Sequence, residues 1–136
     1  MLQRIQSIWL LLAAACAFLS FQFPFYTGTS ADLIPTAVID GKTTIPLMLV
    51  TATIGITALI CIFLYKNRTL QLRLTLLCIV LEVLLIFLYY SQVKTFTSGT
   101  YALTALLQGC IAFFLFLAAK GINHDSKIIR ESNRLR

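Results

Sequence analysis

The sequence predicts an all-α membrane protein: a bundle of four transmembrane helices with a short loop hairpin at one end and an amphipathic tail at the other. Hydrophobic residues make up 59% of the 136 residues and charged residues only 12%, whereas a soluble domain averages about 25% charged residues. Four apolar runs approach the roughly 20 residues that a helix needs to cross a bilayer. We expect these helices at residues 5–25, 45–65, 74–93 and 101–119. Because they fill most of residues 1–136, we expect a single domain.

The distribution of Lys and Arg predicts the orientation in the membrane. Nine of them fall in the N-terminus, in the link between the second and third runs, and in the tail, whereas only Lys42 and Lys94 fall on the opposite side. Cytoplasmic loops are enriched in Lys and Arg, so we expect both termini in the cytoplasm. This asymmetry accounts for most of the net charge of +6, and we expect no nucleic-acid partner.

The first apolar run has two interpretations, a cleaved signal peptide or a retained helix. The apolar part of a signal peptide is about 7–15 residues long, and here the apolar character continues through Phe25. We therefore expect a retained helix. Its small residues at positions 13–17 favour close approach of a neighbouring helix.

The longest external loop, residues 27–44, contains a turn signal. Asp40-Gly41 lies between β-prone residues, which is typical of a two-residue β-hairpin turn. We expect a two-stranded flap, serving either as a plain connector or as a lid over the bundle.

The tail, residues 120–136, changes character. Ile122, Ile128, Ile129 and Leu135 recur at helical spacing among charged residues. This pattern predicts an amphipathic helix along the anionic inner leaflet, either continuous with the fourth helix or bent near Gly121.

The residues of common catalytic and metal sites are missing. The four cysteines, at positions 16, 61, 78 and 110, fall inside the predicted spans without a Cys-x-x-Cys pair, and His124 is the only histidine. We expect the cysteines to be small packing residues. The usual catalytic constellations cannot be assembled from this set, so we expect no enzyme activity, no metal and no cofactor.

Glu82 is the exception in the third run, because it lies in the middle of an apolar span. A charge at the centre of a membrane helix costs roughly 2.5–3.5 kcal/mol on insertion scales. From similar expected depths we predict an intramembrane polar cluster of Glu82, Gln108, Thr53 and Thr57. Three roles stay open: a neutral glutamate that joins helices, a contact with a partner subunit, or an ion or substrate site.

Three polar segments carry a resemblance to a known family. They are residues 1–6, residues 63–73 and residues 125–136, the last reading DSKIIRESNRLR. In order and spacing they resemble a family of small four-helix inner-membrane proteins of Bacteroidota, catalogued as domain of unknown function 4293. The resemblance implies four spans, an inner-membrane location and a basic cytoplasmic tail, and it implies no activity.

These observations favour a non-enzymatic accessory or scaffold subunit of a larger assembly in the bacterial inner membrane. Another membrane protein and anionic lipid are the expected partners. The expected docking residues are basic and cytoplasmic: Lys66, Arg68, Arg73, Lys127, Arg130, Arg134 and Arg136. The alternative is a small proton- or cation-coupled transporter centred on Glu82.

Overall fold

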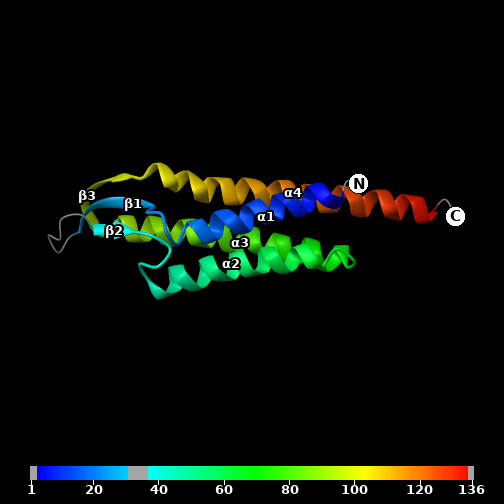
Figure 1. Ribbon diagram of the computed structural model, residues 1–136, viewed down its shortest axis with the longest axis horizontal. Helices are drawn as coiled ribbons and strands as arrows, with labels where there is room; N and C mark the ends of the chain where they lie inside the picture. The colour runs from blue at the N-terminus through cyan, green and yellow to red at the C-terminus, as the bar shows by residue number, and fades with distance from the viewer. Residues whose placement is uncertain (1–2, 31–36, 135–136) are drawn as a thin grey trace.

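Four long helices run side by side, with a small β-sheet at one end (Figure 1). The structure is a computed structural model that describes residues 3–30 and 37–134. The helices are α1 (Gln3–Leu19), α2 (Ile45–Phe63), α3 (Arg68–Val93) and α4 (Leu106–Arg134), the last preceded by the short 3-10 helix η1 (Leu103–Ala105). The strands are β1 (Tyr26–Ser30), β2 (Ala37–Ile39) and β3 (Phe96–Tyr101).

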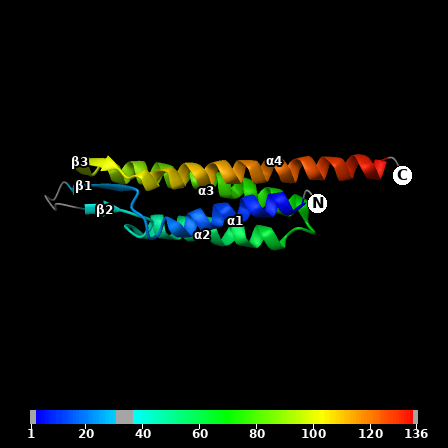
Figure 2. The same cartoon turned by 45° about the horizontal axis from the view of Figure 1, so that its top comes forward.

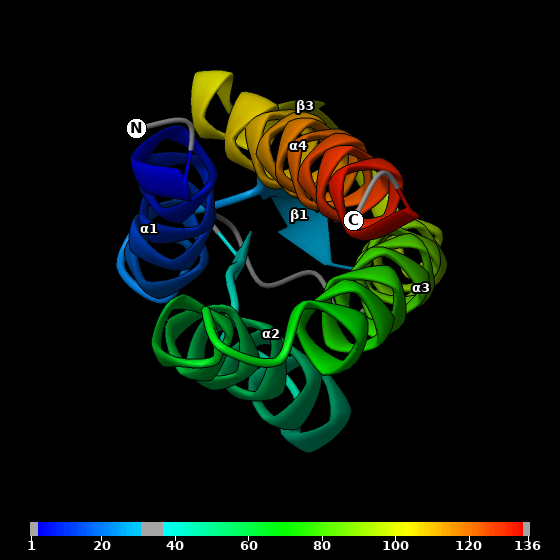
Figure 3. The same ribbon diagram turned by 90° about the vertical axis from the view of Figure 1, so that its right-hand side faces the viewer.

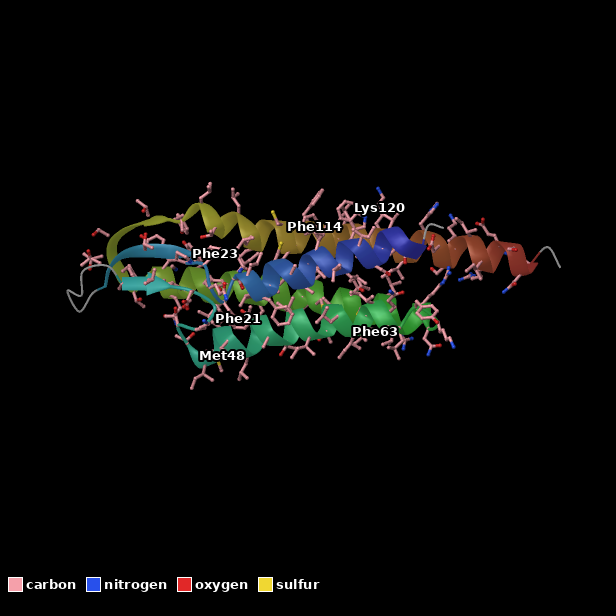
Figure 4. The ribbon with its side chains drawn as sticks, in the orientation of Figure 1. Phe21, Phe23, Met48, Phe63, Phe114 and Lys120 are labelled. Atoms are coloured by element: carbon pink, nitrogen blue, oxygen red, sulfur yellow. The ribbon has the colours of Figure 1, made fainter. Side chains whose placement is uncertain are left out.

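The four helices form a closed ring around a common interior, as the end-on view shows (Figure 3). α1 packs on α2 and α4, and α3 packs on the same two helices. Leu10, Leu47 and Leu115 are fully buried inside. The outer surface is also apolar, since Met48 and Phe63 of α2 are 43% and 79% exposed and point away from the ring (Figure 4). Helices that are apolar on all faces suit a lipid surrounding.

By length and composition, three of the helical segments can cross a membrane. They are Ile45–Phe63, Arg68–Val93 and Leu103–Arg134, whereas the apolar part of the first helix, Ile5–Leu19, is shorter. The prediction of a first helix through residue 25 is therefore wrong, because α1 ends at Leu19. The chain then turns, and the backbone amide of Phe25 donates to the carbonyl of Ile39 at 2.7 Å. Pairing with the sheet has replaced the last helical turn.

The third helix begins six residues earlier than the predicted 74. Most of the link expected at residues 66–73 forms the first turns of α3 instead. Only a short turn separates Phe63, the end of α2, from Arg68, the start of α3. The Gln71 side chain donates to the carbonyl of Cys61 at 2.9 Å. This bond ties the first turns of α3 to the last turn of α2, and it brings Gln71 into the interior.

The sheet differs from the predicted flap. It has three antiparallel strands in the order β2-β1-β3, and β3 was not expected. Asp40-Gly41 forms the turn from β2 into α2 rather than a hairpin tip, because the Asp40 carboxylate accepts from the backbone amide of Lys42 at 2.8 Å. Gly28 pairs with Gly99, and a Cβ on Gly28 would lie 2.2 Å from the carbonyl oxygen of Ser98. Only glycine permits this close approach.

α4 is one continuous helix that projects past the other three (Figure 2). The predicted start at residue 101 is wrong, since β3 and η1 occupy residues 96–105. The bend considered near Gly121 does not occur within the described part of α4. Gly121 packs against Gln6, and the Gln6 amide donates a hydrogen bond to the Asp125 carboxylate. The described part of the tail is therefore continuous with the fourth helix, which is one of the two expected arrangements.

Candidate functional site

The inward face of α3 carries a line of polar side chains. Its six buried positions follow the alternating spacing of three and four residues that keeps side chains on one face of a helix. Five of the six can form hydrogen bonds; we call them the polar seam: Gln71, Thr75, Cys78, Glu82 and Tyr89. The sixth is Leu85, which lies between Glu82 and Tyr89.

Glu82 lies in the middle of the polar seam and is 0% exposed. Among the described residues, neither of its carboxyl oxygens has a hydrogen-bond partner. The Cys78 thiol and the Tyr89 phenol, on the same helix, are within electrostatic range. An apolar interior tolerates a carboxyl group far better when it is neutral. Because Glu82 is fully buried inside the ring, it does not reach the outer surface of the described structure.

Gln108 is also buried, but it lies at a different depth from Glu82. Leu72 and Ile79 of α3 line one groove together with Asn123 and Phe116 of α4, which sets the antiparallel register of the two helices. If Leu72 lies opposite Asn123 and Ile79 opposite Phe116, the same antiparallel register places Gln108 opposite residue 87. That position is roughly 7 Å along α3 from Glu82. The side-chain carbonyl of Gln108 has no partner in the described part of the chain. The predicted bond between Glu82 and Gln108 is therefore not formed.

The predicted threonines of α2 are also placed differently. Thr53 is exposed, and its hydroxyl donates to the carbonyl of Leu49 at 2.7 Å. Thr57 is half-buried. The fully buried threonine is Thr51, which lies near Tyr89. Thr53 therefore does not belong to the interior cluster, and Thr51 does.

The polar seam contacts other segments of the chain at both ends. Toward the α2–α3 turn, the Thr75 hydroxyl donates to the carbonyl of Gln71 at 2.9 Å and lies 4.0 Å from the sulfur of Cys61. Toward the sheet, Phe25 stacks on the Tyr89 ring with centroids 4.4 Å apart. The polar groups thus extend along α3 from its first turns to the sheet.

A second polar region lies where α4 projects beyond the ring. A groove of about 600 Å³ is lined by the following residues: Thr69, Asn123, Ser126, Lys127, Arg130, Glu131 and Arg134. It contains three of the predicted docking residues. Lys66, Arg68 and Arg73 lie in or just after the α2–α3 turn at the same end but are not among the lining residues, and Arg136 lies outside the described residues.

Comparison with known sequences supplies the family. A sequence profile described as "Domain of unknown function (DUF4293)" matches residues 2–135. The chain belongs to the DUF4293 family. No curated protein and no solved structure shows significant similarity to it. Within residues 3–30 and 37–134 of this DUF4293 chain, no three potential metal-ligating side chains lie together.

The sequence interpretation missed four members of the polar seam in this DUF4293 protein. Gln71 was assigned to a loop, Cys78 was taken as a packing residue, and Thr75 and Tyr89 were not assigned to a site. The available signal was the spacing of polar residues on both sides of Glu82, at positions 71, 75, 78, 82 and 89. Recognising it required extending the third helix back to Arg68.

Proposed function

We propose that this DUF4293 protein is a non-enzymatic, multi-pass protein of the bacterial inner membrane that serves as an accessory subunit of a larger assembly. In this proposal its four helices form a transmembrane bundle with both termini in the cytoplasm. The projecting end of α4, residues 127–134, docks an acidic segment of another membrane protein. The observation that carries the proposal is that every one of these residues is exposed on a continuous helix.

The surface chemistry of this projection suits a protein partner. Ile128 and Ile129 are 44% and 43% exposed, and Lys127, Arg130 and Arg134 line the adjoining groove against the single acidic residue Glu131. Apolar contacts with a surrounding set of cations favour a partner segment of opposite charge.

The direction of the projecting helix favours a protein partner over lipid in this proposal. From Lys120 to Arg134 the helix rises roughly 21 Å along its own axis, in the direction of the other helices (Figure 2). Its last turns therefore point away from a membrane that the ring spans. Anionic lipid headgroups remain within reach of the basic residues nearer the ring, such as Lys120, which is exposed on α4 (Figure 4).

Site-specific photo-crosslinking of the full-length protein in its native membrane tests this proposal. A photoreactive amino acid replacing Ile129 should capture one protein in stoichiometric yield, through a peptide rich in Asp and Glu. The Arg130→Glu/Arg134→Glu variant should abolish this product, because it reverses the charge of the docking surface. Lys94→Glu, at the opposite end, is the matched control and should leave it unchanged. Crosslinks to lipid alone, or a product insensitive to charge reversal, would contradict the proposal.

A second candidate function is a small proton- or cation-coupled transporter centred on Glu82. The observation that favours it is the complete burial of a carboxyl group without a hydrogen-bond partner among the described residues. A proton flux assay in vesicles containing the purified protein tests it. Flux above that of empty vesicles, lost in Glu82→Gln, is the expected result for a transporter.

A further inference from the structure

We propose that Glu82 is a reversible proton-binding site that exchanges its proton with water only through the end of the molecule that carries the α2–α3 turn. The route follows Cys78, Thr75 and Gln71, and Leu85 closes the route toward the sheet. The inference does not depend on the docking role of α4, and it holds for a structural subunit and for a transporter.

The first step of the argument concerns Glu82 itself. It is 0% exposed, and its two carboxyl oxygens lack hydrogen-bond partners among the residues described. No charged side chain in that set acts on it. A buried polar group without a partner is costly, and a carboxyl group without a nearby cation can remain uncharged only by keeping its proton. The group that Glu82 is suited to hold in this position is therefore a proton.

The second step is the polarity of α3 on the side of the α2–α3 turn. The inward positions from Glu82 to Gln71 are the amide Gln71, the hydroxyl Thr75 and the thiol Cys78, of which Cys78 also belongs to the hydrophobic core. Cys78 interacts with both Glu82 and Cys61, and Thr75 bonds to the Gln71 carbonyl and approaches Cys61. Gln71 lies one turn from Arg68, next to the exposed residues of the α2–α3 turn. In the proposal these consecutive hydrogen-bonding groups pass the proton when the helices open enough to admit a few waters between them.

The third step is the contrast on the side of the sheet. The next inward position after Glu82 is Leu85, which is 0% exposed. Beyond it, Tyr89 lies against Phe25, with ring centroids 4.4 Å apart. Ser20, Thr51 and Asp40 lie near the Tyr89 hydroxyl on this side. In the proposal, the fully buried Leu85 separates Glu82 from these polar groups and makes proton access one-sided.

The titratable groups around the site are few. On α3 they are Cys78 and Tyr89, and on α2 Cys61. The Asp40 carboxylate, in the turn between β2 and α2, acts on Tyr89. α1 and α4 contribute Cys16 and Cys110, which lie within electrostatic range of each other. None of these thiols or phenols supplies a positive charge, so a charged Glu82 would have no counter-ion among them. In the proposed step the carboxyl O–H bond breaks, the oxygen keeps the electron pair, and the proton passes to water at the α2–α3 turn.

The first measurement establishes the protonated group. Dicyclohexylcarbodiimide, which adds to protonated carboxyl groups in apolar surroundings, is applied to the full-length purified protein and the adduct is mapped by mass spectrometry. An adduct at Glu82 that diminishes as pH rises, and that Glu82→Gln removes, is expected. No adduct at Glu82 at any pH, or a yield independent of pH, would overturn the proposal.

The second measurement establishes the route. Transfer into deuterated water shifts the infrared C=O band of a protonated carboxyl, and the band lost in Glu82→Gln identifies this residue. Thr75→Val should slow the exchange by about tenfold, the factor that corresponds to losing one hydrogen-bonding group. Thr53→Val is the matched control, because Thr53 also bonds to the carbonyl four residues earlier but faces outward. It should leave the rate unchanged.

A further variant replaces the apolar Leu85 on the side of the sheet, to test whether this residue blocks proton exchange there. Adding Leu85→Ser to Thr75→Val should restore fast exchange, because a hydroxyl then replaces the apolar barrier. If Thr75→Val fails to fold, as judged by circular dichroism, Cys78→Ala takes its place in both variants. Equal slowing by Thr53→Val, or no exchange in the unaltered protein, would show that the proposed route does not exist.

Discussion

At the scale of single residues, Glu82 combines full burial with missing hydrogen bonds among the described residues. Buried carboxyl groups that hold helices together do so through hydrogen bonds, and interhelical polar contacts in membranes average only about 0.6 kcal/mol. Glu82 lacks even this contribution. Its presence in the interior therefore costs stability, which points to a role other than joining helices.

Glu82→Leu should leave the thermal stability unchanged or raise it. The substitution removes no hydrogen bond and relieves a buried polar group, a gain of about 1–3 kcal/mol. Thermal unfolding in detergent measures this effect. Leu85→Ala, at the next inward position, is the comparison and should lose about 2–5 kcal/mol by creating a cavity. A loss for Glu82→Leu as large as that for Leu85→Ala would mean that the carboxyl group stabilises the ring.

At the scale of elements, the sheet joins segments that are far apart in the sequence. β1 lies between β2 and β3, and Tyr26 of β1 packs edge-on against Phe96 and Tyr101 of β3. Aromatic residues are enriched at the membrane–water interface, so this end of the ring suits the boundary of the bilayer. The sheet also links the end of α1 to the connection between α3 and α4.

Gly28→Ala should weaken the pairing of β1 with β3. A Cβ at this position would overlap the backbone of Ser98 and Gly99, and overpacking of this kind costs about 1–3 kcal/mol. Amide hydrogen exchange should show faster exchange in both strands, with the helices less affected. Gly109→Ala is the control, because a Cβ there would meet nothing within 4 Å. Unchanged protection in Gly28→Ala would contradict the observed register.

The continuity of α4 predicts a distance. Nitroxide labels on Phe113→Cys and Arg134→Cys in a cysteine-free background should lie about 31 Å apart at helical rise, against about 23 Å for a right-angle bend at Gly121. Pulsed electron paramagnetic resonance measures this separation. A distribution centred on the shorter distance would restore the in-plane tail and remove the basis for docking by residues 127–134.

At the scale of the whole molecule, the segments rich in Lys and Arg gather at one end of the ring of helices. The first and last described residues, Gln3 and Arg134, lie toward the same end of the ring (Figure 1). The α2–α3 turn lies at that end too, so the segments that carry nine of the 11 Lys and Arg residues are together. The sheet occupies the opposite end with Lys42 and Lys94. In the proposed topology this basic end faces the cytoplasm, because cytoplasmic segments are enriched in Lys and Arg.

Cysteine labelling in intact cells tests this orientation. Lys42→Cys and Lys94→Cys in a cysteine-free background should react with a membrane-impermeant thiol reagent, because they lie outside. Lys66→Cys and Lys127→Cys should react only after the membrane is permeabilised. Labelling of Lys127→Cys without permeabilisation, together with protection of Lys42→Cys, would reverse the proposed topology.

The helical fold, the number of long helices and the gathering of basic residues at one end could be predicted from the sequence alone. These properties depend on the length of apolar runs and on which links carry Lys and Arg, and both are local in the chain. The sequence also singled out Glu82, because one carboxyl group in an apolar span is visible without knowing its neighbours. The basic segments were sufficient to indicate the DUF4293 family, which the match over residues 2–135 shows.

Which residues surround Glu82, and where the helices end, depends on contacts that form only in the folded molecule. The first helix stops at Leu19 because Phe25 pairs with Ile39, and the third begins at Arg68, with Gln71 bonding to Cys61 of the preceding helix. The grouping of Thr51 rather than Thr53 with the interior depends on how α2 is rotated in the ring. Pairings and rotations of this kind are set by contacts between segments distant in sequence, because apolar helices present nearly equivalent faces until their neighbours are in place.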